Sequence, residues 1–151
     1  MRDTERDLER LDEALRQAPE LSADLFSDVT EHCTRLSSLR QSGKAIQLDR
    51  MIEAGAWTDA AITLTAFELP NWNVRRLICE DGEWLCSLSQ HPSLPIVLDE
   101  PVERSHPVLA LAILRAFMAV RRKGPIVQQA TASVPQVRPS AAFVFCCDNF
   151  A

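Results

Sequence analysis

WNVRRLICEDGEWLCSLSQ, residues 72–90, is the stretch that decides the fold. It contains two apolar-rich runs separated by Asp81-Gly82. An Asp-Gly pair readily supplies the two positive φ angles that a tight hairpin turn needs. The stretch therefore predicts two antiparallel strands joined by a two-residue loop.

Counting outward from the turn gives the register of the hairpin. It pairs Arg76 with Ser87 and, in an uninterrupted ladder, Arg75 with Leu88. Because successive side chains of a strand alternate between the faces, Arg75 and Arg76 are expected on opposite faces. Apolar residues occur on both faces: Leu77, Cys79, Trp84, Cys86 and Leu88 on one, and Trp72, Val74, Ile78 and Leu85 on the other. We therefore expect both faces to be covered, by helices or by another subunit.

The flanking segments have helical spacing. Before the hairpin, we expect helices at residues 4–18, from about 21 or 22 to 41, at 46–52 and at 59–69. Gly43 and Gly55 are interpreted as stop signals, and Thr58 as the N-cap of the fourth helix. After the hairpin, the proline-rich residues 91–106 predict a long loop. A final helix is expected from Ser105 or His106 to Lys123, apolar nearly all round and therefore buried.

Length, charge and composition exclude several classes of protein. The 151 residues have the length of one typical domain, and a net charge of −5 with a pI near 5.2 argues against a general nucleic-acid or membrane-surface binder. The apolar run at residues 108–120 is too short to span a bilayer, so we expect no membrane contact. The charged first residues lack a signal peptide's apolar region, which predicts a cytoplasmic protein. In that compartment, the 5 cysteines are expected to be reduced thiols.

The order of elements in residues 55–122 carries a resemblance. A helix (AWTDAAITLTAFEL), a Trp-led strand, a glycine turn, a second strand with Trp84 and a helix (HPVLALAILRAF) follow one another. This order resembles the phage-type ABA sandwich domain, in which two helices cover a small antiparallel sheet, and a group of small uncharacterised bacterial proteins. The resemblance implies no established activity.

The predicted fold class is α+β, with an N-terminal helical region followed by an α-β-β-α sandwich around one antiparallel hairpin. We expect a helical hairpin plus a short helix in residues 1–54, the sandwich in 55–124 and an extended or partly disordered tail in 125–151. The tail is rich in Pro, Ala, Ser and Gln and ends on AAFVFCCDNFA.

No motif in the chain carries specific chemistry. The 4 glycines are isolated, so no phosphate-binding loop can be built, and no Cys-x-x-Cys zinc spacing occurs. We therefore predict no catalytic residue, no metal ligand and no cofactor. The speculative ligand or partner site consists of Arg76, which needs a carboxylate or a ligand on an apolar face, and of titratable groups in or beside the predicted loop: His91, Asp99, Glu103 and His106.

These patterns favour a non-catalytic protein–protein interaction or adaptor module over an enzyme; its pathway is unknown, and the resemblance suggests a phage-derived origin. A two-stranded sheet is marginal alone, which predicts a homodimer. The alternative is a small-molecule or metal-binding regulator that uses residues 91–106. Nucleic-acid binding would require Arg121, Arg122 and Lys123 to join further basic residues on one face, and we do not expect it.

Overall fold

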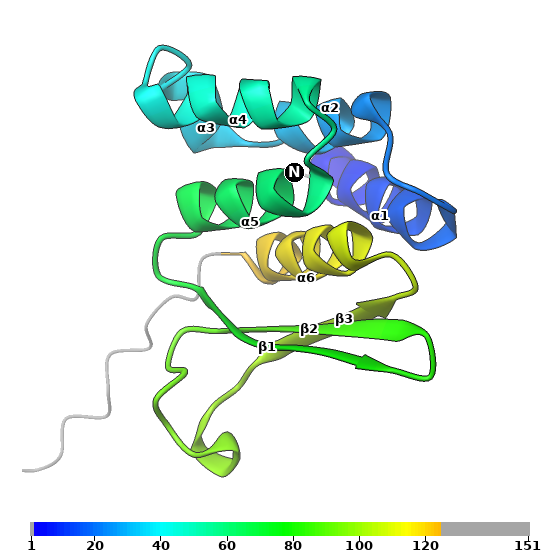
Figure 1. The fold of residues 1–151 in the computed structure, drawn as a ribbon. Helices are drawn as coiled ribbons and strands as arrows, with labels where there is room; N and C mark the ends of the chain where they lie inside the picture. The colour runs from blue at the N-terminus through cyan, green and yellow to red at the C-terminus, as the bar shows by residue number, and fades with distance from the viewer. Residues whose placement is uncertain (1, 125–151) are drawn as a thin grey trace, which may run out of the picture.

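The computed structural model describes residues 2–124 (Figure 1). The chain is an α+β protein with N-terminal helices, followed by a helix, a hairpin-containing sheet and a final helix, which confirms the predicted class. The predicted tail, with Cys146 and Cys147, lies outside the described residues. The elements are α1 (Arg2–Gln17), α2 (Ala23–Glu31), α3 (Thr34–Ser38), α4 (Gly43–Glu53), α5 (Trp57–Glu68), β1 (Asn73–Glu80), β2 (Glu83–Ser89), η1 (Ile96–Leu98, a 3₁₀ turn), β3 (Val102–His106) and α6 (Leu109–Lys123).

The predicted hairpin is confirmed. Strands β1 and β2 are antiparallel, and the turn residues Asp81 and Gly82 have φ angles of 51° and 81°. Two consecutive positive φ angles match the right-handed twist of the flanking strands. From the turn to Arg76 opposite Ser87, the register is the predicted one.

The register changes at Arg75. Between Val74 and Arg76 the ladder contains a β-bulge, so that Val74, and not Arg75, pairs with Leu88. The prediction for Arg75 is wrong because a bulge places one extra residue in one strand. Val74 consequently shares a face with Leu88, and Trp72 packs against the buried core, which moves both residues from the face where they were expected.

The sheet has a third strand that the sequence did not predict. Strand β3 pairs antiparallel with β2, giving the order β1-β2-β3. The predicted loop therefore ends before Val102, and the final helix begins at Leu109, later than expected. Here the imidazole Nδ1 of His106 accepts a hydrogen bond of 2.9 Å from the Val108 N–H, beside the start of α6.

The N-terminal helices differ from prediction at their ends. The expected second helix is divided between α2 and α3, and Gly43 begins α4 and does not end a helix. Ser42 explains this start, because its hydroxyl accepts the Ala45 N–H at 3.3 Å as an N-cap. Helix α5 begins at Trp57, so Thr58 lies inside it and is not its cap.

The helices lie on one side of the sheet. Helix α6 packs against β2 and β3, and α1 and α5 pack on α6 (Figure 1). Nearly every residue of α6 from Ala110 to Val120 is buried, and these residues share one core with Cys86 and Leu88 of β2. As predicted, the apolar run is a buried helix.

The expectation that helices cover both faces is wrong. Within residues 2–124, no α-helix lies on the face opposite α6, and η1 is the one short 3₁₀ helix on that side (Figure 1). Whether another subunit covers that face stays a prediction. In the same part of the chain, every helix is too short or too polar to cross a lipid bilayer.

Candidate functional site

The face of the sheet opposite α6 is called the open face. Pairing across the three strands arranges its side chains in rows, because paired residues share a face. One row is Ile78, Leu85 and Ser105, and the next is Arg76, Ser87 and Glu103. Ile78 and Leu85 are half-buried, so the open face offers apolar surface in its first row and charge in its second.

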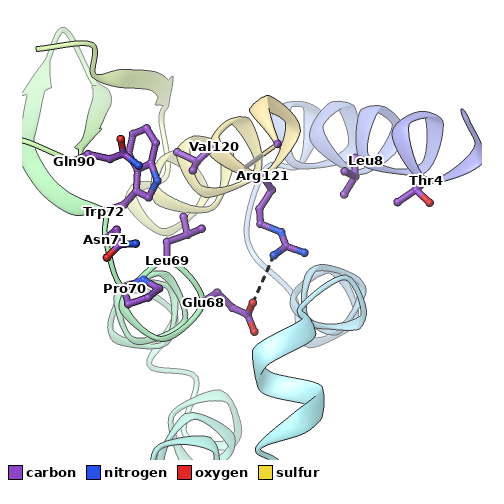
Figure 2. Close-up of a pocket in the computed structure, with 11 residues that line it drawn as sticks. Thr4, Leu8, Glu68, Leu69, Pro70, Asn71, Trp72, Gln90, Val120 and Arg121 are labelled. Atoms are coloured by element: carbon purple, nitrogen blue, oxygen red, sulfur yellow. Dashed lines mark ion pairs between the residues drawn. The ribbon is translucent and has the colours of Figure 1, made fainter. Parts of the chain in front are cut away.

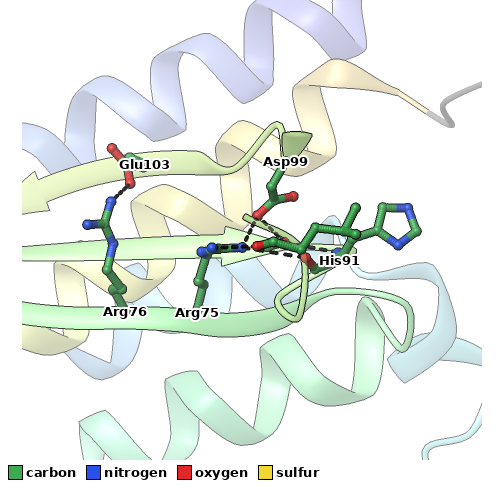
Figure 3. Close-up of polar contacts among 7 residues, drawn as sticks. Arg75, Arg76, His91, Asp99 and Glu103 are labelled. Atoms are coloured by element: carbon green, nitrogen blue, oxygen red, sulfur yellow. Dashed lines mark hydrogen bonds and ion pairs between the residues drawn. The ribbon is translucent and has the colours of Figure 1, made fainter. Parts of the chain in front are cut away.

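An ion pair crosses the second row. The Arg76 Nη2 lies 2.9 Å from the Glu103 Oε1, and the two side chains are 37% and 36% exposed (Figure 3). The pair joins the two edge strands above Ser87, which is fully buried between them. Among the described residues, neither the Arg76 Nε nor the Ser87 hydroxyl has a hydrogen-bond partner. Arg76 therefore has the carboxylate that its position on an apolar face requires.

A second, more buried ion pair anchors the segment between β2 and β3. The Arg75 Nη1 and the Ser89 hydroxyl both donate to the Asp99 Oδ2, each at 2.6 Å (Figure 3). The side chains of Arg75 and Asp99 are only 12% and 2% exposed. The hydrogen bond from Ser89, and then the charge of Arg75, hold the pKa of Asp99 below its usual value although desolvation acts in the opposite direction.

The same arginine also binds the backbone of this segment. Its guanidinium donates to the carbonyl oxygens of Leu94 at 2.8 Å and His91 at 3.4 Å. Ser89 lies two residues from Ser87 and therefore on the open face, and its hydroxyl binds Asp99, so the Asp99 carboxylate is also on that side. Arg75 reaches this carboxylate because the bulge takes it out of the regular alternation of β1. Arg75 and Arg76 consequently both reach the open face, and the prediction that they point to opposite faces is wrong.

The anchored segment presents exposed apolar side chains, and residues 94–98 are called the apolar loop. Leu94 is 38% exposed, Ile96 54%, Val97 92% and Leu98 70%. Figure 1 shows this loop on the side of the sheet away from the helices. Contiguous exposed apolar residues of this kind are typical of interaction sites.

A groove of about 560 Å³ lies at the hairpin end of the open face. Ile78 and Leu85 contribute its apolar lining, with Arg76 and Ser105 beside them. Three exposed carboxylates of the hairpin turn, those of Glu80, Asp81 and Glu83, complete the lining. The open face thus has an acidic apolar groove at one end and the apolar loop at the other.

The structure does not bring the two candidate histidines together. His106 pairs with Trp84 near the hairpin turn and is buried, whereas His91 follows the opposite end of β2 and is exposed. Asp99 and Glu103 belong to separate ion pairs with Arg75 and Arg76. In residues 2–124, no group of three or more His, Cys, Asp and Glu residues is placed to hold a metal ion.

A second cavity, of about 580 Å³, lies between the ends of α5 and α6 and the start of β1 (Figure 2). Leu8, Trp72 and Val120 supply apolar lining, and Glu68 and Arg121 form an ion pair at 3.6 Å on one side. The Glu68 side chain is fully buried and accepts the Leu36 N–H of α3 at 2.6 Å. This pair has a structural role, since it caps a helix that has no side-chain cap of its own.

The basic end of α6 is largely neutralised by acidic residues. Arg121 pairs with Glu68, and Arg122 pairs with Glu9 at 3.1 Å and with Asp12 at 3.5 Å. These arginines therefore do not add to a basic face of the kind that nucleic-acid binding would require.

The described cysteines are free thiols in two environments. Cys33 and Cys86 are buried, and desolvation raises the pKa of each to about 12. Neutral buried thiols pack as small apolar groups. Cys79 is exposed and shares a face with Cys86, as the register predicted.

The chain matches no protein family, no curated protein and no solved structure with which it was compared. The resemblance to a phage-type ABA sandwich therefore stays a prediction. Sequence reasoning missed Arg75 as an anchor and the apolar loop as a surface. The run SLPIVL is a visible signal for the latter, although its exposure depends on the tertiary structure.

Proposed function

We propose that this protein is a non-catalytic interaction module that binds a partner protein on the open face and the apolar loop. The observation that carries the proposal is the exposure of Val97 and Leu98, 92% and 70%, on the side of the sheet that lacks α-helices. Burying one such side chain in an interface contributes up to about 1.5–3 kcal/mol. A contact with both would supply a substantial part of a specific binding energy.

The anchoring of the loop supports the same proposal. Arg75 holds the backbone at Leu94 and the side chain of Asp99, at the two ends of the exposed segment. A surface that is already held in its binding conformation loses less conformational entropy when a partner docks. The buried polar cluster therefore has a use in binding although it touches no partner itself.

The alternative, a small-molecule or metal-binding regulator, finds less support. It requires His91 and His106 to line one cleft with Asp99 or Glu103, and the two histidines follow opposite ends of β2. The carboxylates are already occupied by arginines. We therefore favour a macromolecular partner, and a second copy of the chain is one identity that the test below distinguishes.

Site-specific photo-crosslinking of the full chain in its native cell tests the proposal. A photoreactive amino acid at Val97 is compared with one at Ile46, which is 45% exposed on α4. We expect a discrete protein adduct from position 97 that is absent from position 46 and disappears when Leu98→Asp is added. An adduct of twice the chain mass would identify the predicted homodimer. Absence of any adduct from position 97, or equal adducts from both positions, would contradict the proposal.

A further inference from the structure

We infer that the partner segment bound by the open face is both apolar and basic, with a lysine or arginine placed at the hairpin end of the sheet. The inference rests on the proposed function and adds the chemistry of the partner. Its starting point is that the acidic groove and the apolar loop occupy the two ends of one face.

The groove carries negative charge that the described chain does not neutralise. Glu80, Asp81 and Glu83 are exposed and line the groove, and none of them forms an ion pair within residues 2–124. The lining cation, Arg76, is already paired with Glu103. The carboxylates of the turn are therefore the charges on this face that remain available to a partner.

Two other carboxylates near this face are not available in the same way. Asp99 is 2% exposed at its side chain and binds Arg75 and Ser89, and Glu103 is held by Arg76. Beside the loop, Glu100 is exposed and forms no ion pair within residues 2–124, so the free negative charge is three carboxylates at the hairpin turn and one near the loop. The excess of free negative charge therefore lies at the hairpin end. An acidic partner segment would meet repulsion in the groove, whereas a basic one is attracted to it.

The length of the sheet sets the spacing within the partner segment. Glu83 lies at the hairpin end of β2, and Ser89 marks the end of β2 that the loop anchor reaches. Six residues of a strand extend about 20 Å. A partner helix would cover that distance in about thirteen residues and an extended peptide in about six. A basic side chain and an apolar cluster at such a separation would reach both ends of the face together.

Selection from a phage-displayed library of random 16-residue peptides against the immobilised full chain tests the inference. Peptides are kept that bind the wild type but not Val97→Asp. We expect these peptides to be enriched in lysine or arginine beside apolar residues. Their affinity should fall about three- to ten-fold in the double variant Glu80→Gln/Glu83→Gln. The matched control Glu20→Gln/Glu31→Gln, which removes two exposed carboxylates from the helical region, should bind like the wild type.

The outcomes separate the inference from the function on which it rests. Peptides that depend on Val97 but have no basic enrichment, and bind Glu80→Gln/Glu83→Gln as tightly as the wild type, would overturn the inference and leave the proposed surface intact. Failure to recover any peptide that depends on Val97 would overturn both. Circular dichroism of each variant shows whether the fold is retained, and the exposed positions of Val97, Glu80 and Glu83 make that the expected result.

Discussion

Alkaline pH is expected to destabilise the fold through two buried thiols, Cys33 and Cys86. Desolvation raises the pKa of each from 9.0 to about 12 in the folded state. Above pH 9 the unfolded chain loses these protons while the folded chain keeps them. The free energy of unfolding therefore falls as pH rises. The stabilisation is fully present below pH 9 and is lost progressively up to about pH 12.

The magnitude follows from the size of the shifts. One pH unit between the two pKa values changes the free energy of unfolding by about 1.4 kcal/mol for each thiol. At about pH 10.5 each thiol therefore costs about 2 kcal/mol, and both together about 4 kcal/mol. This loss is a large share of the roughly 5–15 kcal/mol that stabilises a typical domain. The chain has no tyrosine, so few other side chains ionise in this range.

Urea unfolding of the full, reduced chain, followed by tryptophan fluorescence, measures the effect at about pH 8.5 and pH 10.5. The double variant Cys33→Ala/Cys86→Ala should lose most of the pH dependence, although cavities lower its stability at both pH values. Cys79→Ala is the control, because the Cys79 side chain is exposed. An unchanged pH dependence in the double variant would refute the assignment to the buried thiols.

Three further predictions concern charge, packing and accessibility. Asp99→Asn should lower the protection of amides in residues 91–98 against hydrogen exchange, measured relative to their intrinsic exchange rates. In the wild type the same loss of protection should appear on acidification, because a lowered pKa stabilises the fold above pH 3.8 and that stabilisation is lost as pH falls through the folded-state value. Glu68→Ala should cost about 3 kcal/mol in urea unfolding and Glu68→Gln less, since the amide oxygen can still accept the helix-capping hydrogen bond; equal losses would contradict this role. Phe117→Ala should cost about 3–5 kcal/mol in the same assay, because its side chain is fully buried in α6; a loss below about 1 kcal/mol would show that the core is packed differently.

The parts of the fold that the sequence predicted are those with a local cause. The hairpin depends on the positive φ angles of Asp81-Gly82, and the burial of α6 depends on its own apolar composition. Strand β3 has no comparable signal, because VERSH is short and its middle residues are polar. It is a strand because β2 offers a free edge beside it. The bulge at Arg75 likewise has no sequence signal, because no glycine or proline lies beside it.

The candidate site, like the fold, was predictable only where the cause is local in the sequence. The need of Arg76 for a carboxylate follows from its position between apolar residues, and Glu103 meets it through β3. His91 and His106 looked like the two ends of one loop. Strand β3 instead runs back along β2 from Leu88 to Trp84 and carries His106 away from His91. Sequence spacing alone could not distinguish these two paths.

The bulge gives β1 one residue more than its ladder needs. Deleting Arg75 would bring Val74 and Arg76 together opposite Leu88 and Ser87, and every other pair of the hairpin would keep its partner. The core-facing residues before the bulge would stay on their side of the sheet. Asp99 would lose its cation and the apolar loop its anchor. A single codon lost at this position could thus free the loop while the strand pairing of the hairpin is kept, at a cost in stability because the buried carboxylate of Asp99 would be left without its cation.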